Sequence, residues 1–214
     1  VRVFLNTSIE NLELIPHYHY STFIYLRKLN DTEKINTFFS GINEKLPDDG
    51  NFVCCFEKKS TRKKKFLQKY PPGINYILYS LDYFFKRFIP KLFFSRRIYH
   101  SLKGGKNRIL SKAEVLGRFY CHGFEVIEEK KIDGLLYVWA QRKRNPTPVY
   151  NRTYGPLIKL KRYGKNGKEI YVYKFRTMHP YSEYLQEYVY QRHSLQDGGK
   201  FNKDFRVTTI GKFM

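Results

Sequence analysis

The sequence has few of the residues that cross-link small proteins or build metal sites. It contains three cysteines in 214 residues, and two of them, Cys54 and Cys55, are adjacent. This pattern gives neither a disulfide framework nor a Cys-x-x-Cys motif, so we expect reduced thiols and a cytosolic setting. His17 and His19 could share a strand face, but no matching carboxylate or cysteine cluster follows them. We therefore expect two exposed loop histidines rather than metal ligands.

Acidic residues are also scarce. Lys and Arg total 40 against 19 Asp and Glu, which gives a formal net charge of +21. Such a field implies a polyanionic partner, which would be a nucleic acid, an anionic membrane surface or a phosphorylated substrate. Aromatic residues are abundant instead, at 18%, and almost all are Tyr and Phe. Tyr and Phe mixed with basic residues suit a membrane interface or a surface on which bases stack.

The first part of the chain predicts α/β structure. Residues 21–57 read as a strand, a helix and a strand, with Asn30 or Asp31 as the N-cap of the helix. Residues 112–120 predict a second helix that ends at Gly123. The two strands expected after it lie at 124–129 and 135–140 and are joined through Asp133-Gly134.

This order of elements resembles the second half of a class I S-adenosylmethionine methyltransferase. The segments Leu46–Phe52 and His122–Val126 carry the likeness. It implies that residues 1–144 form a partial methyltransferase-like, Rossmann-type α/β unit. The cofactor loop of that family belongs to its first half, so the resemblance implies no methyltransferase active site here. A generic α/β unit is the alternative.

A basic helical insertion is expected within this unit, at about residues 58–110. It opens with a run of lysines, and apolar residues then recur every three or four positions from Ile74 to Phe94. This spacing predicts a helix with one continuous apolar face and an opposite polar side that carries Asp82 and Arg87, with a kink at Pro90. The charges exclude a simple bilayer-spanning helix and are typical of a helix lying on a membrane surface. The alternative is a helix whose apolar face packs on a neighbouring domain.

The most informative segment lies at the C-terminal end. Residues 162–173 predict a hairpin with Asn166-Gly167 at its turn and a half-buried second strand. The second strand leads into Lys174–Met178, and Asp204–Gly211 follows after a further 25 residues. Both segments carry basic side chains suited to phosphate.

We expect Lys174, Arg176 and Arg206 to bind substrate phosphates, because guanidinium groups hold phosphate oxygens in pairs. Asp204 would orient Arg206 or lie near a metal ion, and the first role is favoured. The residues expected to support the three basic side chains are Arg162, Asp204 and Thr208.

Three motifs in this order, R-x-G-x-x-G-K, Y-K-F-R-T-M and D-x-R-V-T-x-x-G-K-F, resemble the opening of the bacterial sugar transferase domain. The resemblance implies that residues 145–214 are a small α+β start of that domain. Its members are monotopic phosphoglycosyl transferases that move a sugar 1-phosphate from a nucleotide sugar to polyprenyl phosphate. It further implies Mg²⁺ as cofactor and a place at the cytoplasmic face of the bacterial inner membrane.

The chain departs from this family in two ways. The catalytic Asp-Glu pair of the family would lie beyond Met214, so we expect no catalytic residue in this fragment and no activity from it alone. The family's re-entrant helix is also missing before the hairpin, where Asn145–Pro148 reads as a linker. Either Ile74–Phe94 replaces that anchor or the attachment lies elsewhere.

Other features have simpler interpretations. Glu183 and Glu187 lie one turn apart in an expected helix and read as a solvated face rather than an acid–base pair. The loop Gln196–Lys200 reads as a connector. The alternative function is a non-catalytic basic module that binds lipid headgroups or nucleic acid, or a methyltransferase-derived scaffold. Of these partners we do not expect nucleic acid.

Overall fold

A computed structural model describes residues 12, 15–89, 106–148, 154–155, 157–192, 201 and 204–214. The strands are β1 (Thr22–Lys28), β2 (Asn51–Phe56), β3 (Phe124–Ile132), β4 (Leu135–Arg142), β5 (Leu157–Tyr163) and β6 (Glu169–Phe175). The α-helices are α2 (Ile35–Lys45), α3 (Lys59–Lys69), α4 (Ile74–Tyr83), α6 (Lys112–Cys121), α7 (Gln186–Arg192) and α8 (Thr209–Phe213). Shorter turns are η1 (Leu29–Asp31), η2 (Phe84–Phe88), η4 (Lys165–Gly167) and η5 (Ser182–Leu185).

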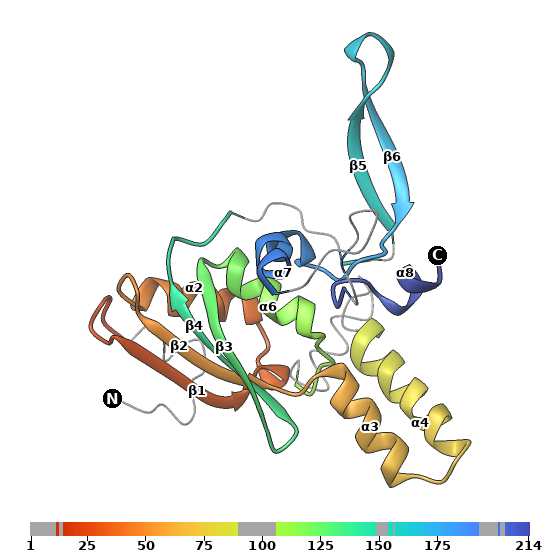
Figure 1. Ribbon diagram of the computed structural model, residues 1–214, viewed down its shortest axis with the longest axis horizontal. Helices are drawn as coiled ribbons and strands as arrows, with labels where there is room; N and C mark the ends of the chain where they lie inside the picture. The colour runs from red at the N-terminus through yellow and green to blue at the C-terminus, as the bar shows by residue number, and fades with distance from the viewer. Residues whose placement is uncertain are drawn as a thin grey trace.

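Four strands form one mixed sheet in the order β1-β2-β4-β3 (Figure 1). β1 and β2 are parallel, with α2 as their crossover, while β4 runs antiparallel to both β2 and β3. The β3–β4 hairpin turns at Asp133 and Gly134, where both residues have positive φ. The expected α/β class and the order of its elements are therefore confirmed.

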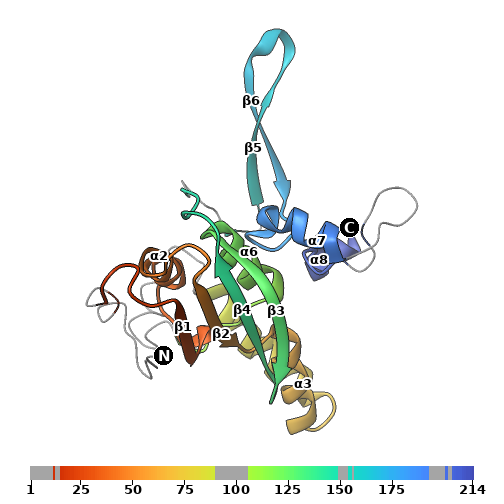
Figure 2. The same cartoon turned by 60° about the vertical axis from the view of Figure 1, so that its left-hand side comes forward.

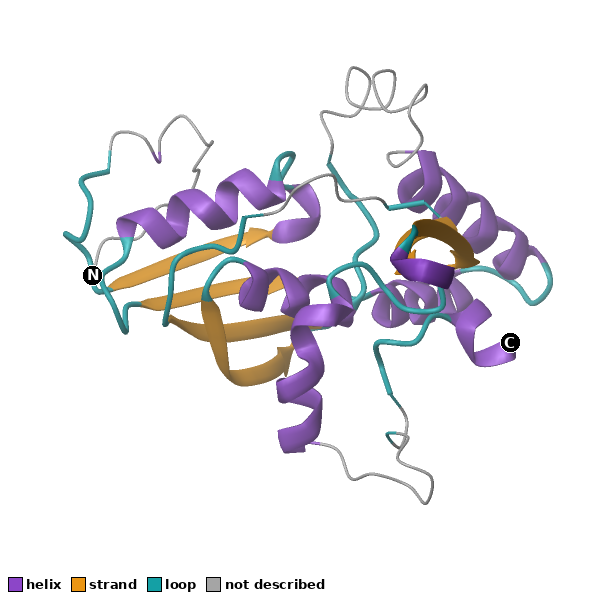
Figure 3. Ribbon diagram, turned by 90° about the horizontal axis from the view of Figure 1, so that it is seen from above, coloured by secondary structure: helices purple, strands orange, loops and turns teal. Residues whose placement is uncertain are grey.

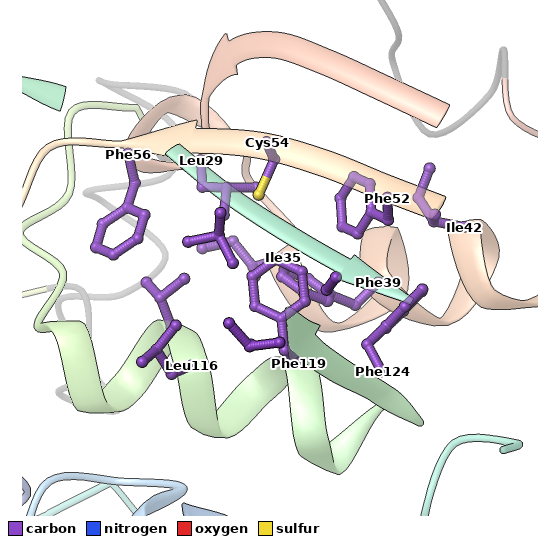
Figure 4. Close-up of a cluster of buried hydrophobic side chains, with 14 of the residues drawn as sticks. Leu29, Ile35, Phe39, Ile42, Phe52, Cys54, Phe56, Leu116, Phe119 and Phe124 are labelled. Carbon is purple, nitrogen blue, oxygen red and sulfur yellow. The ribbon is translucent and has the colours of Figure 1, made fainter. Parts of the chain in front are cut away.

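The core lies between this sheet and two helices that cover the same face (Figures 3 and 4). Phe39 of α2 and Phe119 of α6 meet edge to face, with ring centroids 4.8 Å apart. Phe52 of β2 packs against both rings. Successive side chains of a strand point to opposite faces, and Phe23 and Tyr25 of β1 with Phe52 and Cys54 of β2 are the buried residues on the side of these helices.

The expected N-cap of α2 was wrong. The helix begins at Ile35, and Lys34 precedes it without a side-chain cap. Asn30 is buried instead, where its amide donates to the carbonyls of Glu57 and Arg108 and its Oδ1 accepts from the backbone N–H of Glu57. A buried amide must satisfy its donors and acceptor, and three backbone partners do so here. Asn30 thus ties β2 to the segment before α6.

α3 and α4 form a helical hairpin at one end of the molecule (Figure 1). Gly73 makes the turn with a φ of 87°, and η2 continues α4 as one wider turn. The expected polar side of this helix is not a solvated cationic face. Asp82 binds Arg62 of α3, and Arg87 is buried against the carbonyl of Ile109 and the carboxylate of Glu114. The expected kink at Pro90 and the helix beyond it lie outside the described residues.

The β5–β6 hairpin stands away from the rest of the molecule (Figure 2). The predicted Asn-Gly turn is present, with φ values of 62° at Asn166 and 70° at Gly167. The predicted half-buried second strand is wrong, because all seven residues of β6 are exposed. Alternation along a strand shows that it has two different faces but not that either face meets a core.

The η5–α7 segment packs against α6 and joins the main core. Leu185, Tyr188 and Val189 are buried in the same hydrophobic cluster as Phe119. The boundary expected after residue 144 stays a prediction about the sequence, while in space the two regions share one core. Within the described ranges, no helix is long and apolar enough to cross a membrane.

Candidate phosphate-binding site

Arg162 and Lys174 lie on the same face of the β5–β6 hairpin. Arg162 pairs with Ile170, and Lys174 pairs with Ile158. Both basic side chains are exposed. They are four residues apart along the ladder, roughly 13 Å at the usual strand rise, so they cannot hold one phosphate together. Lys174 therefore lies at the C-terminal end of β6, and Arg162 lies in the half of the hairpin nearer its turn.

The two basic motifs meet directly after β6. The backbone N–H of Thr208 donates to the carbonyl of Thr177 at 2.8 Å, and that of His179 donates to the carbonyl of Arg206 at 2.8 Å. Met178 and Val207 form the bridge between these two bonds. The sequence-distant segments thus form a short antiparallel junction, which we call the motif junction (residues 174–179 and 204–211).

Arg206 lies inside this junction with only 4% of its surface exposed. Its Nε and Nη2 donate to the carboxylate of Asp204, and its Nη1 donates to Gln186 Oε1 at 2.7 Å. Asp204 thus holds the guanidinium of Arg206 in place, while the role of the pair towards a substrate stays a prediction. Asp204 and Gln186 cover the guanidinium surface that a phosphate would need. Arg206 therefore contributes to the shape of the junction.

Arg176 is half-buried at the edge of the junction. Its Nε donates to the carbonyl of Gly155 at 3.0 Å, which fixes the direction of the side chain. Lys174, two residues earlier, is exposed at the end of β6. Of the three expected phosphate-binding side chains, these two are the ones with accessible surface.

Thr208 and Gly211 explain why the last motif has its spacing. The Thr208 hydroxyl donates to the carbonyl of Thr177 and accepts from the backbone N–H of Gly211, which caps α8. A Cβ at Gly211 would lie 2.3 Å from the carbonyl oxygen of Thr177. Only glycine lets α8 approach that backbone so closely. Thr208 therefore supports the junction as a helix cap.

The residues expected in simpler roles lie as follows. His17 is exposed and its Nδ1 lies 2.8 Å from the carbonyl oxygen of Glu44. His19 is exposed as well, and all three cysteines are buried thiols that form no disulfide. Burial raises the pKa of the Cys54 thiol well above its usual value. The loop Gln196–Lys200 lies outside the described residues.

The described residues offer no ligand set for the Mg²⁺ that the resemblance implies. No group of three or more His, Cys, Asp or Glu side chains comes together among them. Asp204, a carboxylate of the motif junction, is engaged by Arg206. The Mg²⁺ that the resemblance implies therefore stays a prediction.

A cavity of about 700 Å³ next to the junction was not expected from the sequence. It lies between α7 and the ends of β3 and β4, and Glu183 and Glu187 line it together with Glu125. Gln186, which binds Arg206, also lines it. The tyrosines of its wall are Tyr120, Tyr184, Tyr188 and Tyr190. The pattern Tyr-x-x-x-Tyr-x-Tyr over 184–190 was the available signal, since it places aromatic rings on neighbouring turns of one helix.

Comparison with known proteins gives one family match. Residues 148–214 match the family described as bacterial sugar transferase. The match spans less than a third of the 214-residue chain. No curated protein matches the chain.

Solved structures resemble the chain only distantly. A protein described as a type 11 methyltransferase from Sulfolobus solfataricus has 12% identity and a TM-score of 0.36, with 66% of this chain and 60% of that one covered. An O-methyltransferase family protein from Burkholderia thailandensis has 10% identity and a TM-score of 0.38, covering 65% and 35%. A possible exported protein from Bordetella parapertussis has 10% identity and a TM-score of 0.40, covering 64% and 43%. The chain thus spans between a third and two thirds of these proteins. At these scores the methyltransferase ancestry of residues 1–144 stays a prediction.

Proposed function

We propose that residues 148–214 are the start of a phosphoglycosyl transferase domain, which moves a sugar 1-phosphate from a nucleotide sugar to polyprenyl phosphate. The sugar transferase family match supports this proposal. The observation that carries it is the motif junction, where Thr177–His179 pairs with Arg206–Thr208. This pairing places Arg176 of one motif beside the other motif, at the open end of the β5–β6 hairpin.

In this proposal the basic residues divide into two roles. Arg176 and Lys174 contact a substrate phosphate, because these two residues have accessible surface at the junction. Arg206 positions the segment that Arg176 lies against, through its bonds to Asp204 and Gln186. A fixed guanidinium at a phosphate stabilises charge that develops during transfer, since it costs no reorganisation at that moment.

The chemistry itself follows from the resemblance. A carboxylate expected downstream of Met214 attacks the sugar phosphate and releases the nucleoside monophosphate. An oxygen of the polyprenyl phosphate then attacks the phosphosugar, restores the carboxylate and forms a polyprenyl diphosphate sugar. The cytoplasmic face of the bacterial inner membrane is the proposed place of this reaction.

A chain in which residues 1–214 are followed by the catalytic carboxylates tests the proposal. Transfer of labelled sugar phosphate from a panel of nucleotide sugars to polyprenyl phosphate is measured in detergent micelles. Arg176→Ala should lower turnover by about 10²-fold or more, and Arg176→Lys should restore only part of it. Lys161→Ala is the control, because Lys161 makes only an exposed ion pair with Glu169. Full activity of Arg176→Ala would remove Arg176 from the site.

The binding step can be tested separately on the 214-residue chain. We expect the ³¹P resonance of a short polyprenyl phosphate in neutral micelles to shift with this chain and not with its Arg176→Ala variant. We also expect this chain to transfer no sugar phosphate by itself. Transfer by the 214-residue chain would show that the reaction does not need a downstream carboxylate.

The alternative, a non-catalytic basic module, draws on one feature of the structure. α3 has exposed lysines along its length and no acidic residue. Tight binding of single-stranded nucleic acid at physiological salt, lost on Tyr or Phe substitution, would favour this alternative.

A further inference from the structure

The apolar side of α4 and η2 faces outward. Ile77 is 63% exposed, Phe85 is 56% exposed and Leu81 is 50% exposed. Ile74 and Phe84 are exposed to a similar extent. These five residues lie on one side of a helix with 3.6 residues per turn, and we call them the α4 apolar face. A contiguous apolar patch of this kind on a soluble surface marks a contact site.

The polar side of the same helix is held against the protein. Asn75 is buried and its amide donates to the carbonyl of Leu67 at 3.2 Å. Asp82 accepts two hydrogen bonds from Arg62, at 2.7 and 3.0 Å. The helix is therefore inverted relative to an ordinary surface helix, whose apolar stripe faces the core.

These contacts fix the orientation of the helix. Turning the α4 apolar face inward would separate Asp82 from Arg62 and withdraw Arg87 from Glu114, which is buried. Leaving a buried charge without its partner is strongly unfavourable. The apolar face is thus an outward surface of this fold, with its direction set by two ion pairs.

The helical hairpin that carries the α4 apolar face is strongly basic. Residues 58–81 contain seven basic residues and no acidic one. Lys63 of α3 has its Nζ 5.8 Å from the ring centroid of Tyr76, an exposed α4 residue outside the apolar face. Lys64 and Lys69 on the same helix are exposed. Each basic residue near an anionic lipid surface adds roughly fivefold to the partition constant.

We propose that the α4 apolar face, carried on the basic α3–α4 hairpin, is the surface by which this protein lies on an anionic lipid bilayer. A second copy of the chain fits this face less well, because its own basic α3 would come close to the first. Charge complementarity selects anionic headgroups, and the apolar residues enter the boundary between headgroups and acyl chains. The inference rests on the proposed function only in that the acceptor of the reaction is a membrane lipid.

Vesicle flotation with the 214-residue chain tests the proposal. Vesicles of phosphatidylcholine that contain about 30% phosphatidylglycerol, an anionic lipid, are compared with vesicles of phosphatidylcholine alone. We expect binding to the anionic vesicles that the double variant Ile77→Asp, Phe85→Asp weakens by at least about tenfold. The double variant Lys64→Gln, Lys69→Gln should weaken it by about tenfold or more at low salt and by less at high salt.

Ile170→Asp is the matched control, because Ile170 is 44% exposed on the β5–β6 hairpin, which lies away from α3 and α4 (Figure 1). It should bind like the unchanged chain. Circular dichroism on each variant checks the fold, and α3–α4 contacts are kept because neither double variant touches Arg62 or Asp82.

Three results would overturn the proposal. The first is no binding of the unchanged chain to anionic vesicles, and the second is equal binding by the Ile77→Asp, Phe85→Asp variant. The third is a dimer that the unchanged chain forms without lipid and the variant does not form, which would assign the face to self-association. The vesicles contain neither polyprenyl phosphate nor nucleotide sugar, so none of these results bears on the transfer reaction, and loss of transfer in micelles would leave the vesicle result standing.

Discussion

The guanidinium carbon of Arg118 lies 4.5 Å from the ring centroid of Tyr181. Arg118 belongs to α6 of the α/β unit, and Tyr181 belongs to the segment that follows the motif junction. Arg118 also binds Glu114 and Asn36, and the Asn36 amide donates to the hydroxyl of Tyr181 at 2.6 Å. A buried polar network therefore joins the two regions that the sequence separates, and through Glu114 it reaches Arg87 in η2.

Gly117→Ala should destabilise the protein although alanine is the better helix former. A Cβ at Gly117 would lie 2.3 Å from the carbonyl oxygen of Tyr181, so the two segments would have to separate. We expect a loss of about 1–3 kcal/mol in the free energy of unfolding, measured by urea titration. Gly155→Ala, with no atom within 4 Å of the added Cβ, is the control. A stabilised Gly117→Ala variant would show that helix propensity outweighs this contact.

Tyr181→Phe should cost about 1–2 kcal/mol of stability. The hydroxyl of Tyr181 accepts from the Asn36 amide and lies 2.8 Å from the hydroxyl of Tyr154. Without this hydroxyl the half-buried amide of Asn36 loses its 2.6 Å hydrogen bond. Tyr154→Phe should cost less, because the Asn36–Tyr154 distance is 3.5 Å. Equal unfolding midpoints for both variants would contradict this ranking.

Arg206 and Asp204 should be energetically coupled. Arg206→Ala removes the guanidinium that pairs with the Asp204 carboxylate, whose side chain is 12% exposed, and leaves it the backbone N–H of residue 206. We expect a loss of about 3 kcal/mol for this single variant. The double variant Arg206→Ala, Asp204→Asn should lose less than the sum of the two single variants. Strict additivity in a double-mutant cycle would mean that the pair does not shape the junction.

The α3–α4 hairpin should weaken in acid. Burial by itself raises the pKa of Asp82, but hydrogen bonds from Arg62 and Lys86 outweigh it and lower that pKa below its ordinary value of 3.8. A lowered folded-state pKa gives stability that is present above the unfolded value and is lost as pH falls through the folded one. Stability should therefore drop below about pH 4, and Asp82→Asn should remove this part of the drop. Asp133→Asn, at an exposed turn, serves as the control. An unchanged acid transition in Asp82→Asn would contradict the assignment.

The three thiols should be unreactive in the folded protein. Cys54, Cys55 and Cys121 are buried, and burial raises the pKa of Cys54 and Cys55 above the ordinary value. A thiol reagent such as dithionitrobenzoate needs an exposed thiolate. We expect no rapid reaction at neutral pH and three equivalents of reaction in denaturant. One fast equivalent without denaturant would show that a cysteine lies in a region that opens locally.

The sequence by itself determined the local elements. The strand and helix segments of the α/β unit, the Asn-Gly turn of the β5–β6 hairpin and the amphipathic α4 all follow from short-range signals, because backbone preference and residue spacing act over a few residues. The sequence motifs also identified Asp204 as the partner of Arg206, which lies two residues away.

Only the tertiary structure decided which side of each element meets the protein. Amphipathicity gave α4 two sides, and partners 20 and 27 residues away, Arg62 and Glu114, hold its polar side inward. For the same reason the residues of β6 alternate although neither face of the strand is buried. The sequence suggests that Arg206 is an accessible cation, but its guanidinium donates to Gln186, 20 residues earlier. Which side is buried depends on charges and surfaces that distant segments bring together, and no local pattern contains that information.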